Sequence, residues 1–200
     1  MRKSIIFALV VMCIGIVGCQ SICAQSLTDE QEKEIKEQAK AEAKRLQEEN
    51  WVYQGPDSLE AALYNYYVKT AEGQAFKAVP QTVTDAHSVM RGEAEARTKA
   101  EVAFAREMRA VISSKIDALK GGEEVNVESK TVERKITAEL NGTVVKYFTL
   151  YKEERPRNYT VCVYFASPNL DSPTNSDLIS KAVEKELEQA KKIDESADSE

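Results

Sequence analysis

The chain has 200 residues, of which 42% are hydrophobic, and a formal net charge of −6 at pH 7. This length suits one ordinary domain with tails, and the apolar fraction is enough to build a hydrophobic core. The acidic balance excludes the broad basic surface that nucleic-acid-binding proteins use and gives no attraction to anionic lipid, so we expect no nucleic-acid partner.

Residues 1–24 have the pattern of a secretory leader. Arg2 and Lys3 form a short positive segment, and thirteen apolar residues follow from Ile5 to Val17. A membrane-spanning helix needs about twenty apolar residues, so this run predicts a leader that is removed during export. No later segment has such a run, and we therefore expect an exported protein without a transmembrane helix.

Two cleavage sites are compatible with this leader. The sequence IVGC at residues 16–19 resembles the lipobox of bacterial lipoproteins, which makes Cys19 a candidate for lipidation. The sequence ICA at residues 22–24 resembles an ordinary leader-peptidase site, with a bulky Ile three residues before the cleaved bond. The first site predicts a lipoprotein held stably by two acyl chains at the outer membrane, and the second predicts a periplasmic protein.

Residues 27–49 are predicted to form a charged helix. Thr28 and Gln31 fit a capping box, and a narrow, mostly alanine stripe follows at helical spacing. Such a stripe buries little surface, so we expect a solvated spacer between the leader and the domain. The alternative is a helix that pairs with a partner or with the C-terminal helix. The stripe consists of Ile35, Ala39, Ala43 and Leu46.

The next segments begin a single predicted domain at residues 50–167. Residues 50–56, NWVYQGP, suit a short strand, and Asp57 and Glu60 can cap a helix that ends before Gly73. A strand is expected at 75–83, where Pro80 places it on a sheet edge or at a bulge. The apolar positions of the helix, Leu59, Leu63, Tyr66 and Tyr67, are interpreted as core residues rather than a ligand cage.

Residues 88–119 give the strongest helical signal, because apolar side chains recur every three or four residues. The expected buried face consists of Val102, Ala105, Met108, Ile112, Ile116 and Leu119, broadened by Ala94, Ala100, Phe104 and Val111. Gly121 and Gly122 are expected to end the helix. The many alanines allow close approach to a sheet.

A shorter helix, 129–140, and a turn at Asn141-Gly142 are predicted to lead into a β-hairpin. Its strands are expected at 143–152 and 159–166, joined by the charged link 153–158. The second strand places Tyr159, Val161, Val163 and Phe165 on one face.

Residues 168–200 are predicted to hold a linker, an amphipathic helix and a disordered acidic tail from residue 194. The helix carries its apolar stripe at Ile179, Val183, Leu187 and Ala190. The fold class that follows is α+β: a long, alanine-rich helix packed on a small antiparallel sheet, with flanking N- and C-terminal helices.

The order of these elements resembles the lipoprotein-twenty family of small bacterial envelope lipoproteins and the related N-terminal domain of the flagellar protein FlgT. The resemblance rests on GEAEARTKAEVAFAREMRAVISSKI, SKTVERKITAEL, TVVKYFTLY and YTVCVYF, and it covers roughly residues 75–167. It implies a long helix on an antiparallel sheet and a role in the envelope. It carries over no catalytic residue, and Cys19 matches the lipid-bearing cysteine of the family. The segment 50–73 and the C-terminal helix depart from the pattern.

Reactive groups are few. His87, the single histidine, has no metal-ligand partners at suitable spacing, and it fits a solvated position at a helix entry. Glu93 and Glu95 are explained by the favourable field at a helix N-terminus. Cys162 fits a small buried apolar side chain, and no disulfide framework is visible. We therefore expect no metal, no cofactor and no enzymatic activity.

The sequence predicts a non-catalytic module of the bacterial cell envelope that binds an envelope protein or the cell wall through the sheet edge or the terminal helices. One alternative is a structural oligomer formed through the terminal helices. The other is an enzyme of unrecognised type that uses Glu93, His87 or Cys162, and such a site would need these groups to converge in one cleft.

Overall fold

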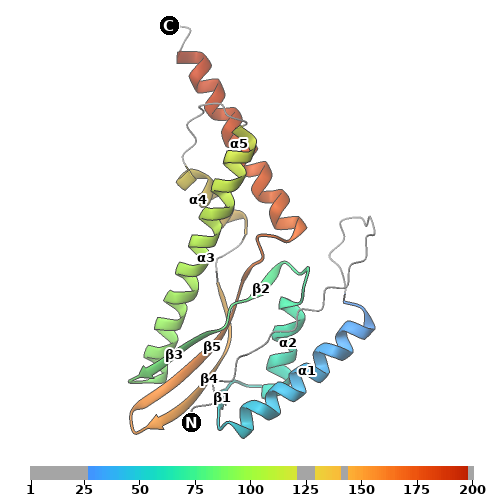
Figure 1. Cartoon of the computed structure of the whole chain (residues 1–200), viewed down its shortest axis with the longest axis vertical. Helices are drawn as coiled ribbons and strands as arrows, with labels where there is room; N and C mark the ends of the chain where they lie inside the picture. The colour runs from blue at the N-terminus through green and yellow to red at the C-terminus, as the bar shows by residue number, and fades with distance from the viewer. Residues whose placement is uncertain (1–26, 121–128, 141–143, 198–200) are drawn as a thin grey trace, which may run out of the picture.

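Figure 1 shows a computed structural model of the chain, which describes residues 27–120, 129–140 and 144–197. The leader, both cleavage sites and Cys19 lie outside these residues, as do Gly121-Gly122 and Asn141-Gly142. The elements are α1 (Asp29–Glu48), β1 (Val52–Gln54), α2 (Leu59–Thr70), β2 (Phe76–Ala78), β3 (Gln81–Ala86), α3 (Val89–Lys120), α4 (Ser129–Glu139), β4 (Val145–Arg155), β5 (Asn158–Pro168) and α5 (Pro173–Ala197). The α+β class is confirmed.

All strand pairs of the sheet are antiparallel, in the order β1-β4-β5-β2, and β3 also pairs with β5. The predicted hairpin is β4 and β5, each of 11 residues. Its strands extend further than expected, so that the link shortens to Pro156 and Arg157. Arg157 adopts the left-handed conformation, with φ 62°.

Pro80 lies between β2 and β3, where the predicted strand at 75–83 is interrupted. Proline lacks the N–H that a continuous strand would need at this position. Strands β2 and β3 both pair with β5, one on each side of this break. Between them, the Val79 amide still donates to the Phe165 carbonyl at 2.8 Å. Within the described residues nothing pairs beyond β2 and β3, so the predicted edge position is confirmed.

Helix α1 begins and ends through local hydrogen bonds. The predicted capping box at Thr28 and Gln31 is present. At the other end Asn50 has φ 61°, and the Trp51 amide donates to the Leu46 carbonyl at 2.9 Å. This is the six-to-one bond of a Schellman motif, in which a left-handed residue closes the helix.

The expectation of a solvated spacer at 27–49 is wrong. Ala39 and Leu46 are buried in one core cluster with Leu63 of α2, and α1 packs along α2. The stripe is narrow, but its alanines let two helices approach closely. Ser58, rather than Asp57 or Glu60, caps α2, because its hydroxyl accepts from the Ala61 amide at 3.1 Å.

The sheet lies between two helical layers. On one face, Val161, Val163 and Phe165 pack against Ala96 and Ala100 of α3, as the alternation in β5 predicted. The opposite face is covered by α2 and α1 and is rich in aromatic rings. Figure 1 shows α3 on one side of the strands and the α1–α2 pair on the other.

An aromatic cluster holds α2 to the sheet. Tyr66 is 1% exposed and donates its hydroxyl hydrogen to the Phe165 carbonyl at 2.8 Å. The rings of Phe148 and Tyr164 stack with centroids 4.3 Å apart, and Tyr66 meets both edge-on. The interpretation of the tyrosine stripe as core is therefore confirmed at Tyr66, while Tyr67 is half-buried.

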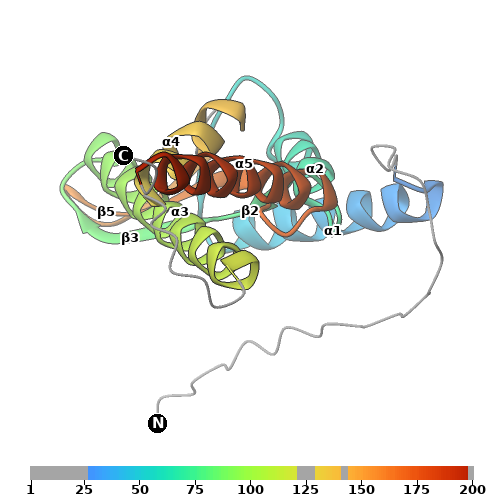
Figure 2. The same ribbon diagram turned by 90° about the horizontal axis from the view of Figure 1, so that it is seen from above.

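The second half of α3 leaves the sheet and packs with α4 and α5. These three helices contact one another pairwise around a separate apolar cluster that includes Ile112, Ile136 and Ile179. Seen from above, α5 lies between α4 and α3 (Figure 2). Helix α5 continues to Ala197, so the expectation of a disordered tail is wrong for residues 194–197.

The buried stripe of α3 differs in part from the expected one. Val102 and Leu119 are each 44% exposed. The buried positions recur every fourth residue: Gly92, Ala96, Ala100, Phe104, Met108, Ile112 and Ile116. Four residues turn an α-helix by about 400°, so each step moves the buried face by roughly 40°. The stripe winds around α3 because its partners change from the sheet to α4 and α5.

Candidate functional site

The outer edge of β4 is only partly covered. Strand β1 pairs with Thr149–Tyr151 in the middle of β4. Elsewhere along this edge, at 145–148 and 152–155, no strand of the described chain is paired. Exposed strand edges offer backbone N–H and C=O groups to a further strand. Two short stretches of β4 can therefore accept one.

The two stretches differ in chemistry. Residues 152–155 have the sequence KEER, and charged side chains of this kind protect an edge against further pairing. Residues 145–148 have the sequence VKYF, with one charge. Val145 at this stretch and Val52 in β1 are 46% and 44% exposed. The less protected edge therefore lies at 145–148, and we define this stretch as the free edge.

A polar cluster beside the free edge fixes its only charged side chain. The Lys146 ammonium lies 2.7 Å from a carboxylate oxygen of Glu93, which also accepts from the hydroxyl of the buried Thr149. Partial burial acts to raise the pKa of the Glu93 carboxyl. Hydrogen bonds from Lys146 and Thr149 and the charges of Lys146 and Arg97 outweigh it, so the pKa lies below its ordinary value. The cluster ties α3 to β4.

The other predicted reactive groups lie elsewhere. His87 is exposed in the connection between β3 and α3, as expected. Cys162 is a free, half-buried thiol whose pKa is raised by burial, against the opposing effect of a hydrogen bond with Thr82. A raised pKa disfavours the thiolate, which is the nucleophilic form.

The structure does not bring the candidate groups together. Cys162 packs with the aromatic cluster on the α2 face of the sheet. Glu93 bonds Thr149, which pairs with Val163 on the opposite, α3 face. Glu95 forms its own ion pair with Lys99 at 2.9 Å, one helical turn away. Within the described ranges no three His, Cys, Asp or Glu side chains are placed to hold a metal ion.

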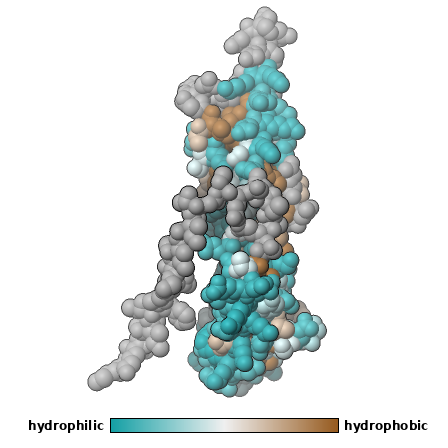
Figure 3. Space-filling view, turned by 90° about the vertical axis from the view of Figure 1, so that its right-hand side faces the viewer, coloured by the Kyte–Doolittle hydropathy of each residue, from teal (hydrophilic) through white to brown (hydrophobic). Residues whose placement is uncertain are grey.

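A groove of about 520 Å³ lies between α1 and the start of α2. Its walls mix both signs of charge, with Lys40 and Lys44 opposed by Glu37 and Glu60, over a floor that includes Leu59. This mixture favours no single class of ligand. Figure 3 shows that the surface on this side of the molecule is mainly hydrophilic over its lower half, whereas apolar side chains gather higher up.

Sequence reasoning named a sheet edge as a binding surface but did not locate the free edge at 145–148. The available signal was a difference in length: WVY between a helix end and Gly-Pro leaves room for a very short strand, while TVVKYFTLYK predicts a long one. A short strand beside a long one leaves part of the edge uncovered. Their pairing is a tertiary property that spacing along the chain does not give.

No described helix combines the length and apolar character needed to cross a membrane. Comparisons with protein-family models, with curated proteins and with solved structures find no match for this chain.

Proposed function

We propose that this protein is a non-catalytic binding or scaffold module of the bacterial cell envelope. In this proposal residues 1–24 direct export, and the mature protein is either anchored through lipid on Cys19 or free in the periplasm. Its partner is another envelope protein. An extended segment of that partner adds to the sheet of this protein as a further strand. The leader pattern and the resemblance to envelope lipoproteins support the location.

The observation that carries the binding role is the free edge at 145–148. An added strand there gains backbone hydrogen bonds to β4, and its side chains contact the exposed Val145. The added strand would continue the line of β1 along β4. The pairing of β1 ends at Gln54 because the chain turns away at Gly55-Pro56. Lys146 is held by Glu93, so its charge is partly neutralised and opposes strand addition less.

Photo-crosslinking in living cells tests the binding role. A photoreactive amino acid replaces Val145 in one variant and Val102 in a matched control, since Val102 is also a valine and is 44% exposed on α3. We expect a discrete crosslinked adduct from position 145 and none from position 102. Equal adducts from both positions, or none from position 145, would contradict the proposal.

Mass spectrometry of the mature N-terminus tests the location. A diacylated Cys19 or a free N-terminal Gln25 would each support export, the first at a membrane and the second in the periplasm. A chain that keeps residues 1–24 in the native organism would contradict it.

A further inference from the structure

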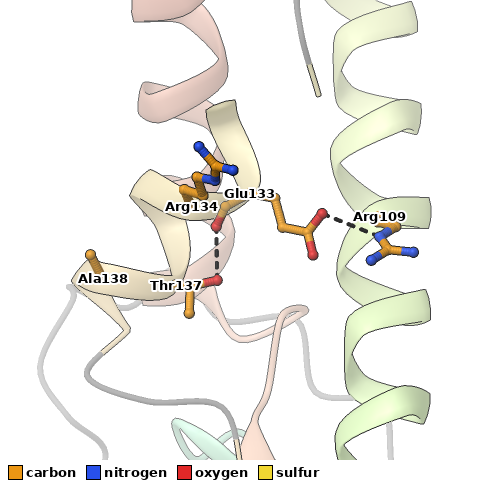
Figure 4. A pocket seen from close by; sticks show the side chains of 5 residues that line it. All are labelled: Arg109, Glu133, Arg134, Thr137 and Ala138. Atoms are coloured by element: carbon orange, nitrogen blue, oxygen red, sulfur yellow. Dashed lines mark hydrogen bonds and ion pairs between the residues drawn. The ribbon is translucent and has the colours of Figure 1, made fainter. Parts of the chain in front are cut away.

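A second open cavity lies between α3 and α4, in the helical part of the molecule. Its volume is about 450 Å³, within the range of small-molecule sites. One wall carries Arg109 of α3, and the other carries four side chains of α4 (Figure 4). The α4 residues are Glu133, Arg134, Thr137 and Ala138.

The cavity has an excess of positive charge. The Nε of Arg109 lies 3.2 Å from a carboxylate oxygen of Glu133, and the Arg109 side chain is 65% exposed. This bond uses one of the five guanidinium N–H groups, and among the described residues the others have no partner. Arg134 likewise has no hydrogen bond or ion pair within the described chain. Two guanidinium groups and one carboxylate therefore line the cavity.

The walls of the cavity are held by the core. Val132 and Ile136, which follow the same helix, are fully buried against α3 and α5. Thr137 donates its hydroxyl hydrogen to the Glu133 carbonyl at 2.8 Å and lies 3.7 Å from the sulfur of Met108. Glu133 in turn orients Arg109 across the gap. The backbone that carries Glu133 and Arg134 is thus fixed before a ligand arrives, which lowers the entropy cost of binding.

We propose that this cavity binds a small organic oxyanion, a carboxylate or a phosphate ester, through Arg109 and Arg134. Guanidinium groups match the planar geometry of such anions and form charge-assisted hydrogen bonds with them. Ala138 and the aliphatic stems of the arginines contact the apolar part of the ligand. The carboxylate of Glu133 limits the negative charge that the cavity accepts. The proposal does not depend on the free edge of β4.

Titrations followed by amide chemical shifts test this site with three probes of one shape: benzoate, phenyl phosphate and the neutral benzyl alcohol. We expect saturable shifts at Arg109 and Arg134 for one or both anions, with dissociation constants of about 1 mM, and none for the alcohol. The stronger of the two anions distinguishes a carboxylate from a phosphate ligand. Saturable binding of the alcohol, or no saturation by either anion, would overturn the proposal.

Substitutions separate the cavity from general charge effects. Arg109→Gln and Arg134→Gln are each expected to weaken binding of the preferred anion by at least about tenfold. Arg106→Gln removes the same charge from an exposed position of α3 that does not line the cavity, and we expect it to leave binding unchanged. Equal weakening by all three substitutions would show that the anion responds only to net charge, and the proposed site would be rejected.

Discussion

Gly92 marks the closest approach of α3 to the sheet. A Cβ atom at this position would lie 2.6 Å from Cγ2 and 2.8 Å from Cβ of Val161. Alanine in a helix is favoured over glycine by about 1 kcal/mol, but overpacking a core costs about 1–3 kcal/mol. We therefore expect Gly92→Ala to lower the free energy of unfolding, measured by urea denaturation.

The matched test of this contact is the double variant Gly92→Ala with Val161→Ala, which makes room for the new methyl group. The free energy of unfolding should fall less in the double variant than the sum of the decreases in the two single variants. Additive losses, or a Gly92→Ala protein as stable as the original, would show that the contact is not tight.

Because of the tyrosines on the α2 face of the sheet, we expect the protein to lose stability at high pH. Burial raises the pKa of Tyr67 to about 12, helped by the charge of Glu42 and opposed by Arg45, while its ordinary value is 10. Burial also raises the pKa values of Tyr66 and Tyr164. The folded state holds the hydroxyl protons of these tyrosines more tightly than the unfolded state does. The stabilisation that results is complete below pH 10 and is lost as the pH rises toward 12.

Urea denaturation between pH 8 and pH 11.5 measures this effect. We expect the free energy of unfolding to fall steadily from about pH 10, and the slope to be smaller in Tyr67→Phe, which has one group fewer to titrate. A stability that stays constant up to pH 11.5 would contradict the expectation.

The structural role of a residue could be predicted from the sequence where the residues that determine the role lie within a few positions along the chain. The capping box of Thr28 and Gln31 needs only local geometry, and it forms as expected. The cap of α2 is Ser58 rather than the predicted Asp57 or Glu60, because Asp57 and Ser58 are adjacent polar residues and local rules do not choose between them. The contact of Gly92 with Val161 joins residues far apart in sequence, and spacing gives no sign of it.

At the scale of elements, α1 shows how packing changes the meaning of a pattern. Its position and cap follow from sequence, whereas its burial depends on α2, which offers Leu63 and Tyr66 to the same cluster. The long helix α3 was likewise predictable in extent. The winding of its stripe was not, because a periodic pattern assumes one partner along the whole length and α3 has two.

Leu46→Ala tests the place of α1 in the core. Leu46 is 3% exposed, so the truncation should lower the free energy of unfolding by about 2–4 kcal/mol in chemical denaturation. Lys36→Ala, at an exposed position of the same helix, serves as the control and should change stability little. If both variants kept the original stability, α1 would be the solvated helix that the sequence first indicates.

At the scale of the whole molecule, the sheet with its two helical layers and the bundle of α3, α4 and α5 have separate apolar clusters joined by α3. The α+β class, the hairpin and the edge strand could be predicted because each depends on local pattern. The separation of the bundle cluster from the clusters on the two faces of the sheet could not be predicted, since it depends on where α3 passes the end of the sheet.

Hydrogen exchange measured by mass spectrometry is expected to resolve these two parts. Strand β5 should exchange most slowly, because it is bonded on one side to β4 and on the other to β2 and β3. Helix α4 has 11 residues and packs mainly against α3 and α5. It should therefore open locally and exchange faster. Equal protection of α4 and β5 would mean that the chain opens only as one unit.

The changing direction of the buried face of α3 makes the number of residues between the two cores a structural constraint. Inserting one residue between Ala100, which meets the sheet, and Phe104, which meets the bundle, would rotate one core against the other by about 100°. A surface loop can absorb such a change of length, but a continuous helix transmits it. The middle of α3 should therefore tolerate substitution at its exposed positions far better than any insertion or deletion.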